Sequence, residues 1–187
     1  MRIIGGKFKG KNIFFLKSGV TRPLKDSVKE SIFNVLIHSN LLNINLNEAN
    51  VLDLYSGIGS FGLECMSRGA SSVTFVERDR SAVEVLNNNL LSLSLKDKSI
   101  VIENDISSFI SKGTSKKFEI IFLDPPFIDN NYIDDLKLIY KNRIYRNRHV
   151  IIIHRERKSA EDFGKNINSL IVKNYGRSKI IFAKFLD

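Results

Sequence analysis

The feature that most limits the fold of this chain is a glycine-rich turn between an apolar run and a helical pattern, at residues 51–64. The apolar run is typical of a buried strand, and the helical pattern stops at Gly69. Gly57, Gly59 and Gly62 lie in the turn, where the absence of a Cβ lets a bound molecule approach the backbone. The helix that follows presents unpaired amide donors and a partial positive charge. This segment therefore predicts a strand, a tight loop and a helix that bind a nucleotide-like ligand.

The rest of the chain repeats this alternation of apolar strands and helical segments. Helices separate the predicted strands that follow the first one, which span 72–77, 99–103, 118–123 and 150–154. Near-continuous apolar strands separated by helices are typical of an open α/β sheet. The last two runs, 169–175 and 178–185, flank Gly176-Arg177 and are typical of a hairpin. We predict an α/β fold, a doubly wound parallel sheet with an antiparallel C-terminal hairpin.

Acidic residues mark the carboxyl ends of four predicted strands. They are Asp53, Glu77, Asp105 and Asp124. In open parallel sheets, ligands bind beyond the carboxyl ends of the strands, at the point where the strand order reverses. Because these ends share one edge of the sheet, we expect the four side chains to form one site.

The composition is typical of a globular protein with a single core. The chain has 187 residues, of which 43% are hydrophobic, and this predicts one domain. No apolar run is long enough for a membrane span and no signal-peptide pattern is present, so we expect a cytoplasmic protein. Cys65 is the single cysteine, and His38, His149 and His154 lack the spacing of metal ligands, so no metal site is predicted.

The formal net charge of +9 is concentrated near the N-terminus. Seven basic residues precede the first acid, Asp26, and they are Arg2, Lys7, Lys9, Lys11, Lys17, Arg22 and Lys25. The remaining 22 of the 29 basic residues nearly balance the 20 acids. A segment with one sign of charge beside a near-neutral body is a candidate contact for a polyanion, and a solvated basic tail is the alternative.

Residues 2–15 alternate short β-type runs with glycines and predict a small N-terminal β-hairpin. Three phenylalanines interleave with its lysines. Aromatic faces can stack on bases while lysines bind phosphates, but phenylalanines in a hairpin more often pack on the domain beneath. We expect packing for Phe14 and Phe15 and leave Phe8 open between the two roles.

Glu77 follows Gly57 by twenty residues, a spacing at which an acid binds the ribose hydroxyls of NAD or of S-adenosylmethionine. The glycine pattern alone does not separate these two cofactors. Asp53 lies just before the loop, where a carboxylate would repel a pyrophosphate but attract the ammonium of a methionyl group. Asp53 therefore favours S-adenosylmethionine over NAD.

The motif Asp124-Pro125-Pro126-Phe127 follows the fourth predicted strand. An exocyclic amine on a nucleobase is a poor nucleophile until both of its N–H groups are hydrogen-bonded. The Asp124 carboxylate and the Pro125 carbonyl are two such acceptors, and the prolines restrict where that carbonyl points. Phe127 offers a face on which the base can stack. The motif predicts methyl transfer to a base amine, with catalysis that comes mostly from positioning of the reactants. The alternative is that the motif is only a turn that ends the strand.

Together, these motifs resemble those of the bacterial 16S ribosomal RNA guanine-N2 methyltransferases of the RsmD family. The similarity covers nearly the whole chain, through residues 2–6, 9–10, 22–34, 57–70 and 124–127. The chain departs from the family pattern at three positions, which are Leu24, Ser27 and Ile58.

The resemblance implies a class I S-adenosylmethionine-dependent methyltransferase with a Rossmann-like fold. Its implied substrate is a guanine 2-amino group of 16S rRNA, within the small ribosomal subunit or its assembly intermediate. The residues implied for the cofactor are Asp53, Tyr55, Gly57, Gly59, Gly62, Glu77 and Asp105. The target base is assigned to Asp124, Pro125, Pro126 and Phe127, and the RNA backbone to Arg2, Lys7, Lys9, Lys11 and Arg22. We expect a monomer with a basic N-terminal hairpin extension, 1–25, and a methyltransferase catalytic domain, 26–187.

Two other functions remain open at this point. An adenine-N6 methyltransferase acting on DNA or RNA would use a similar Pro-Pro-aromatic turn, although the chain has no room for a separate DNA-recognition domain. A non-catalytic RNA-binding assembly factor would keep the basic segment but would need neither Glu77 nor Asp124.

Overall fold

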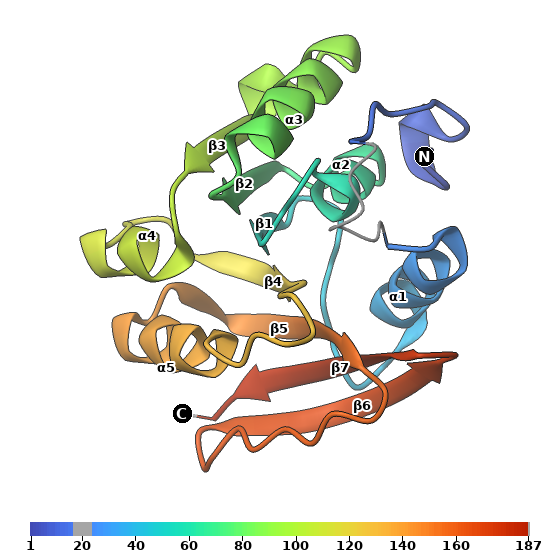
Figure 1. Cartoon of the computed structure of the whole chain (residues 1–187). Helices are drawn as coiled ribbons and strands as arrows, with labels where there is room; N and C mark the ends of the chain where they lie inside the picture. Colours follow the sequence, from blue (N-terminus) through green and yellow to red (C-terminus); the bar gives the residue numbers. More distant parts are fainter. Residues whose placement is uncertain (17–23, 187) are drawn as a thin grey trace.

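Over residues 1–16 and 24–186, which the computed structural model describes, seven strands form one sheet in the order β3-β2-β1-β4-β5-β7-β6 (Figure 1). The strands are β1 (Asn50–Leu54), β2 (Ser72–Glu77), β3 (Ser99–Glu103), β4 (Phe118–Leu123), β5 (Tyr145–Glu156), β6 (Ile167–Tyr175) and β7 (Ser178–Phe185). The first five are parallel, whereas β7 runs antiparallel to both β5 and β6. The predicted α/β sheet with an antiparallel C-terminal hairpin is confirmed.

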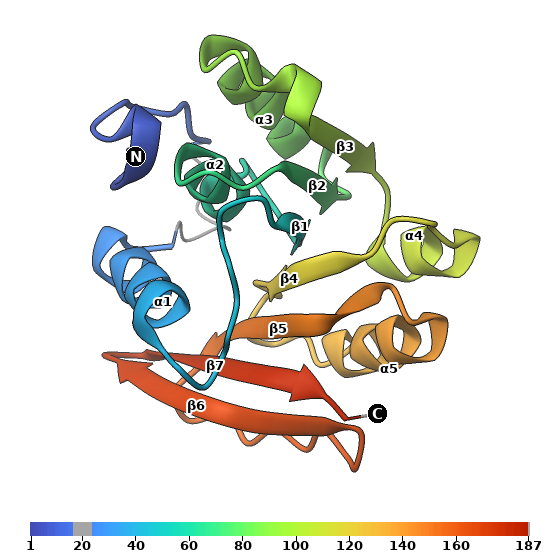
Figure 2. The same ribbon diagram turned by 180° about the vertical axis from the view of Figure 1, so that it is seen from behind.

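Helices cover both faces of this sheet (Figures 1 and 2). The α-helices are α1 (Asp26–His38), α2 (Ser60–Ser67), α3 (Arg80–Ser92), α4 (Ile106–Lys112) and α5 (Tyr132–Asn142). Two short 3₁₀ helices, η1 (Gly6–Phe8) and η2 (Lys96–Lys98), complete the described elements. Helices α1, α2 and α3 pack with one apolar cluster and α4 and α5 with another, so the core has two layers separated by the sheet.

The two core layers follow from the pleat of the strands. In β1, Val51 belongs to the cluster under α1 to α3, and the next residue, Leu52, belongs to the cluster under α4 and α5. Successive strand residues point to opposite faces, and a sheet buried on both faces needs apolar residues at nearly every position. This is why the strands appear in the sequence as continuous apolar runs.

The strand order reverses between β1 and β4, the two central strands of the parallel part. The chain moves outward from β1 to β2 and β3, then returns to place β4 on the other side of β1. Loops after β1 and β4 diverge at this point, which opens a crevice at the carboxyl ends of the strands. The glycine-rich loop follows β1 and the Asp124 motif follows β4, so the fold brings both motifs to this crevice.

The predicted N-terminal β-hairpin is present only in reduced form. The segment 1–16, which we call the N-terminal arm, contains a single antiparallel bridge, Arg2 to Asn12, and its turn is η1. The two ends of the arm pair through Ile3 N to Lys11 O and Ile13 N to Met1 O, both at 2.9 Å, and η1 occupies the chain between them. The middle of the arm binds α2 instead, because Ile4 N donates to Glu64 Oε2 at 2.8 Å and Phe8 N donates to Ser67 Oγ at 2.9 Å.

Strand β5 begins at Tyr145, five residues before the predicted strand. Its first residue pairs with Phe118 of β4, and the register then shifts before Ile120 pairs with Val150. The extra residues lie on the β5 side, between Tyr145 and Val150. They are polar and mostly basic and have no apolar periodicity. Within the described residues, no helix is both long enough and apolar enough to cross a membrane.

Candidate functional site

The strand register brings four polar side chains to one face and one edge of the sheet. Asp53 pairs with Phe75 and with Phe122, so Glu77 and Asp124, two residues further along their strands, point to the same face. This is the face covered by α1, α2 and α3. By the same rule His154, two residues after Ile152, joins this group. The predicted site at the edge of the sheet therefore gathers around Asp53.

Asp53 is a buried carboxylate that binds the start of α2. Its side chain is 1% exposed, and its Oδ2 accepts a hydrogen bond from Gly62 N at 2.9 Å. Burial raises the pKa of Asp53 well above its ordinary value, against the effect of the Gly62 hydrogen bond, and repulsion from Asp124 and Glu77 adds to the rise. Three carboxylates within mutual electrostatic range favour a cationic group between them.

Each glycine of the loop has a separate structural reason. Gly59, the N-cap of α2, has φ +83°, a left-handed conformation that other residues rarely adopt. A Cβ on Gly62 would lie 2.3 Å from the Phe75 ring, so α2 can approach β2 only with glycine there. Gly57 has φ +52°, and a Cβ built on it meets no atom within 4 Å, so it borders open space.

The loop also contains polar groups that fit a bound cofactor. The hydroxyl oxygens of Ser56 and Ser60 are buried, and among the described residues they have no hydrogen-bond partner. Buried polar groups are normally satisfied, so two unsatisfied hydroxyls beside a glycine loop indicate a place for a polar ligand. The residues present therefore fit the methionyl part of S-adenosylmethionine.

Glu77 ends β2 and binds backbone amides of the glycine loop and of the residues that follow β2. Its Oε2 accepts from Gly57 N at 2.8 Å, and its Oε1 accepts from Arg78 N and Asp79 N, both at 2.9 Å. An ionised carboxylate has about four acceptor positions, so it keeps room for a further donor such as a hydroxyl. Glu77 thus links the end of β2 to the glycine loop, and its predicted contact with a ribose stays a prediction.

Asp105 is an exposed N-cap residue of α4. Its Oδ1 accepts from Ser108 N and from Ser107 Oγ, each at 2.8 Å. The hydrogen bond from the Ser108 backbone, and next that from the Ser107 hydroxyl, lower the pKa of Asp105 to about 2. Asp105 is therefore an ionised acceptor at neutral pH, and its contact with the adenine amine stays a prediction.

Tyr55 follows β1 in a left-handed conformation, with φ +56°. Its hydroxyl donates to Asp135 Oδ2 in α5 at 2.8 Å. Burial, and next the hydrogen bond to Asp135, raise the pKa of Tyr55, so the phenol stays protonated. Since α5 occupies the hydroxyl, a contact of Tyr55 with the cofactor would come from its ring or its backbone.

His154, near the end of β5, contacts two residues of the Asp124 motif. His154 Nδ1 lies 2.8 Å from Asp124 Oδ1, and its ring meets the Phe127 ring edge-on at a centroid distance of 5.4 Å. An ionised carboxylate only accepts, so this bond needs the tautomer with its proton on Nδ1. His154 is therefore a partnered residue of β5.

Arg155 is a residue that the sequence reasoning missed. Its side chain is 1% exposed and donates to the carbonyls of Pro126 and Phe127, both at 3.0 Å, and to Asn130 Oδ1 at 3.2 Å. The guanidinium also lies 4.5 Å from the centre of the Tyr132 ring. Arg155 directly follows the predicted strand 150–154, as the predicted acids end or follow theirs. This position was the signal in the sequence that could have identified it.

The predicted RNA-contact residues lie on the N-terminal arm. Lys7, Lys9 and Lys11 are exposed, and exposed Arg2 pairs with Asp26 at 3.2 Å. Arg22 lies outside the described residues. The arm therefore presents a basic surface, and its contact with RNA stays a prediction.

The prediction for the aromatic residues of the arm is wrong. Phe14 is 60% exposed and Phe15 is 49% exposed, whereas Phe8 is partly buried and packs against the core cluster of α1 to α3. In the extended segment that ends the arm, Ile13 points into the core at 4% exposure, so its neighbour Phe14 points outward.

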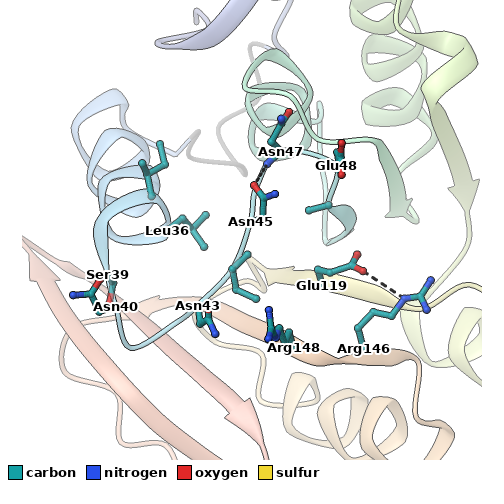
Figure 3. Close-up of a pocket in the computed structure, with 13 residues that line it drawn as sticks. Leu36, Ser39, Asn40, Asn43, Asn45, Asn47, Glu48, Glu119, Arg146 and Arg148 are labelled. Atoms are coloured by element: carbon teal, nitrogen blue, oxygen red, sulfur yellow. Dashed lines mark hydrogen bonds and ion pairs between the residues drawn. The ribbon is translucent and has the colours of Figure 1, made fainter.

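A pocket of about 670 Å³ lies away from the predicted site (Figure 3). It is lined by the end of α1, the linker before β1 and the starts of β4 and β5, which is the amino-terminal edge of the sheet. Of its two acids, Glu48 and Glu119, the second is already engaged, because Glu119 pairs with Arg146 at 3.4 Å and accepts from Asn50 N at 2.8 Å. We therefore place the candidate site at the opposite edge, where the carboxylates gather. Among the described residues, no cluster of His, Cys, Asp and Glu is placed to bind a metal ion.

Comparison with known proteins identifies the family of this chain. The sequence model of the family described as Conserved hypothetical protein 95 matches residues 1–184. Ribosomal RNA small subunit methyltransferase D of Buchnera aphidicola subsp. Baizongia pistaciae is 28% identical over 187 residues, covering 100% of this chain and 92% of that protein. The protein of the same name from Escherichia coli K12 is 34% identical over 152 residues, covering 75% of this chain and 73% of that protein.

The fold shows the same relationship. The solved structure described as putative methyltransferase yhhF from Escherichia coli has a TM-score of 0.84 and 26% identity, and the match covers 99% of this chain and 97% of that one. The family match spans both the N-terminal arm and the catalytic motifs, so it does not rest on the glycine loop alone. The chain therefore belongs to the Conserved hypothetical protein 95 family, which is the RsmD family that its motifs resemble.

Proposed function

We propose that this chain methylates the exocyclic 2-amino group of a guanine in 16S ribosomal RNA, with S-adenosylmethionine as the donor. Methyltransferase activity and an rRNA substrate agree with the relatives named above. The observation that carries the guanine-N2 assignment is Asp124, a carboxylate on the same face as Asp53 whose one oxygen is bound by His154. The other carboxylate oxygen is left to accept an amine N–H.

Asp53, Glu77 and the loop from Gly57 to Gly62 are the residues that would hold the cofactor. When bound, S-adenosylmethionine supplies a methyl group on a cationic sulfonium, and attack by the amine lone pair forms the C–N bond as the C–S electrons return to sulfur. The buried carboxylate of Asp53 attracts a positive group, and Glu77 offers acceptor positions to hydroxyls. The amide donors at the start of α2 face the same crevice.

The Asp124 motif would bind the target amine through two acceptors. Arg155 already engages the carbonyls of Pro126 and Phe127, which supports the Pro125 carbonyl as the second acceptor beside Asp124. Acceptors at both N–H groups draw the amine nitrogen toward tetrahedral geometry and free its lone pair. The proton that the methylated amine loses passes to the Asp124 carboxylate, which is 26% exposed and returns it to water.

The finer parts of the assignment are also proposals. The substrate is the small subunit or its assembly intermediate, the enzyme acts as a monomer in the cytoplasm, and the basic extension, 1–25, contacts RNA while 26–187 carries out catalysis. The basic arm and the carboxylate site support this division, because one part offers cations to phosphates and the other offers acceptors to an amine.

Replacing Asp124 tests the reaction directly. Asp124→Ala removes one amine acceptor and should abolish methyl transfer, while the affinity for S-adenosylmethionine changes less than about threefold, as the cofactor contacts lie on Asp53 and Glu77. The measurement is incorporation of labelled methyl into undermethylated small subunits, with nucleoside analysis and calorimetric cofactor binding.

The control for this experiment is Asp134→Ala, which removes an exposed carboxylate of α5 and should leave transfer unchanged. Loss of cofactor affinity alone in Asp124→Ala would contradict the assigned role. Label found on adenine N6 would replace the guanine assignment, and no incorporation by the wild type would favour a non-catalytic assembly factor.

A further inference from the structure

Two exposed phenylalanines end the N-terminal arm. Phe14 and Phe15 are 60% and 49% exposed, although phenylalanine is among the residues most often buried in folded proteins. They are consecutive residues, and Phe15 also borders a hollow at the end of the arm. An exposed aromatic ring offers a face on which a nucleobase can stack.

Hydrogen bonds from α3 hold the backbone of Phe14 in place. Phe14 N donates to Asn89 Oδ1 at 2.7 Å, and Asn89 Nδ2 donates to Phe14 O at 3.2 Å, so one buried amide from α3 binds both backbone groups. Asn89 is 0% exposed. The backbone at Phe14 is therefore fixed with its ring outside, and the exposure does not come from a frayed end.

The same asparagine connects this surface to the cofactor loop. Asn89 Nδ2 also lies 3.2 Å from Ile58 O, within the loop from Gly57 to Gly62. Phe14 and the glycine loop are thus attached to one side chain of α3. A polymer that lies over Phe14 passes next to the crevice where the Asp124 motif is proposed to bind a base.

The surroundings favour a polyanion as the occupant. Lys7, Lys9 and Lys11 are exposed on the same arm, and no acid precedes Asp26 in the sequence. A hollow of about 280 Å³ beside Phe15 is lined by Met1, Phe15, Leu24, Lys25 and Asp26. It is smaller than the pockets of about 300 to 1,000 Å³ that enclose small ligands.

We propose that Phe14 and Phe15 are a stacking surface for unpaired RNA bases beside the target guanine. This rests on the proposed function, because it takes RNA as the substrate. Aromatic rings stack on any base while lysines bind phosphates, which is how proteins bind single strands without reading sequence. Stacking needs splayed bases, so the surface selects unpaired RNA over a duplex, whose bases are already stacked.

The test separates stacking from charge. Affinity for a labelled single-stranded RNA and for a duplex of the same length is measured by anisotropy at several salt concentrations. In the double variant Phe14→Leu/Phe15→Leu, affinity for the single strand should fall about 5- to 150-fold for each stacked base, with the salt slope unchanged. The duplex affinity should change less than about twofold, and Phe14→Tyr/Phe15→Tyr should restore single-strand binding, since tyrosine keeps the ring.

Leu41→Ala is the control for loss of an exposed apolar side chain, because Leu41 is 68% exposed in the linker after α1. Equal losses for single strand and duplex, an unchanged affinity in the leucine variant, or no rescue by tyrosine would each overturn the proposal. Binding is measured without turnover, so its result is independent of Asp124. Absence of methyl transfer by the wild type would instead refute the proposed function.

Discussion

Asp53 shows how a single residue can be unfavourable for folding and useful for binding. Its carboxylate is fully buried, and one backbone hydrogen bond from Gly62 does not compensate for its lost hydration, so its pKa is raised. A cation bound nearby would supply the missing stabilisation. Such a site trades stability of the unliganded protein for affinity.

Replacing Asp53 with asparagine should therefore stabilise the unliganded protein and weaken cofactor binding. A raised folded pKa means that the stability contributed by Asp53 is full below its ordinary pKa of about 3.9 and is lost as the pH rises through the folded value. Asp53→Asn resembles the protonated form at every pH. The free energy of unfolding of this variant should therefore exceed that of the wild type by a difference that grows to about 1 kcal/mol as the pH rises from 4 toward neutrality. Denaturant unfolding across this pH range measures it, and a variant less stable at neutral pH would contradict the account.

His154 makes a second prediction at the scale of one residue. Its Nδ1 restricts the rotation of the Asp124 carboxylate, so His154→Leu should lower kcat about tenfold to a hundredfold with KM for the cofactor unchanged. His154→Asn should recover much of the loss, because its amide nitrogen can occupy the position of Nδ1. Steady-state kinetics measures both variants, with exposed His38→Asn as the control. Equal activity of the leucine and asparagine variants would show that the hydrogen bond does not position Asp124.

At the scale of elements, the N-terminal arm is attached to α2, the helix that follows the glycine loop. Glu64 of α2 binds Ile4 N through Oε2 and Arg68 Nε through Oε1, at 2.8 and 2.7 Å. Lys29 of α1 is fully buried, donates to Arg2 O at 2.8 Å and lies 3.7 Å from Glu64. Burial lowers the pKa of Lys29, and the negative charge of Glu64 opposes this shift. The arm is therefore part of the same packed unit as the cofactor helix.

Two glycines of the arm provide a matched test of this attachment. Gly6 and Gly10 both have left-handed φ, +73° and +85°, but a Cβ on Gly6 would lie 1.9 Å from Ser67 O, whereas a Cβ on Gly10 meets no atom within 4 Å. Gly10→Ala should cost about 1 kcal/mol of unfolding free energy from backbone strain alone. Gly6→Ala should cost about 2 to 4 kcal/mol, or detach the arm, because overpacking is added.

Hydrogen exchange distinguishes the two results for Gly6→Ala. Detachment should speed exchange at the Ile4 and Phe8 amides, which bind Glu64 and Ser67, and should weaken RNA binding. Similar stability and similar exchange in the two alanine variants would mean that the close contact between the arm and α2 is not needed.

At the scale of the whole molecule, the distribution of charge decides where RNA is expected. The arm carries exposed Lys7, Lys9 and Lys11 with no acid before Asp26, and the rest of the chain is nearly neutral. Each phosphate neutralised by a lysine releases counterions, so affinity falls linearly with salt on a logarithmic plot.

Neutralising Lys7, Lys9 and Lys11 to glutamine should reduce the steepness of this salt dependence by about 2 to 3, at about 0.7 to 0.9 for each phosphate contact. RNA affinity measured over a range of salt concentrations gives the slope. The matched control neutralises Lys158, Lys165 and Lys173, which are exposed on other parts of the chain. An unchanged slope in the arm variant, or an equal change in the control, would remove the arm from the RNA-contact surface.

The sequence by itself determined the fold class and the family, since both depend on local patterns. Short apolar runs predicted β2, β3 and β4 with their observed bounds. The central strand β4 is buried at five of its six positions, because a strand covered on both faces requires apolar side chains almost throughout. The glycine loop and the Asp124 motif were recognisable because their backbone and chemical requirements are met within a few residues.

Only the tertiary structure decided which side chains meet across the sheet. His154 binds Asp124, Arg155 binds the turn after it, and Asn89 joins Phe14 to the glycine loop, over separations of 30, 29 and 75 residues. The exposure of Phe14 and the path of the arm depend on contacts with α3 and α2, whose Asn89 and Glu64 bind backbone amides of the arm. Such contacts follow from strand register and helix docking, which bring distant residues together by packing the whole chain, and no local pattern encodes them.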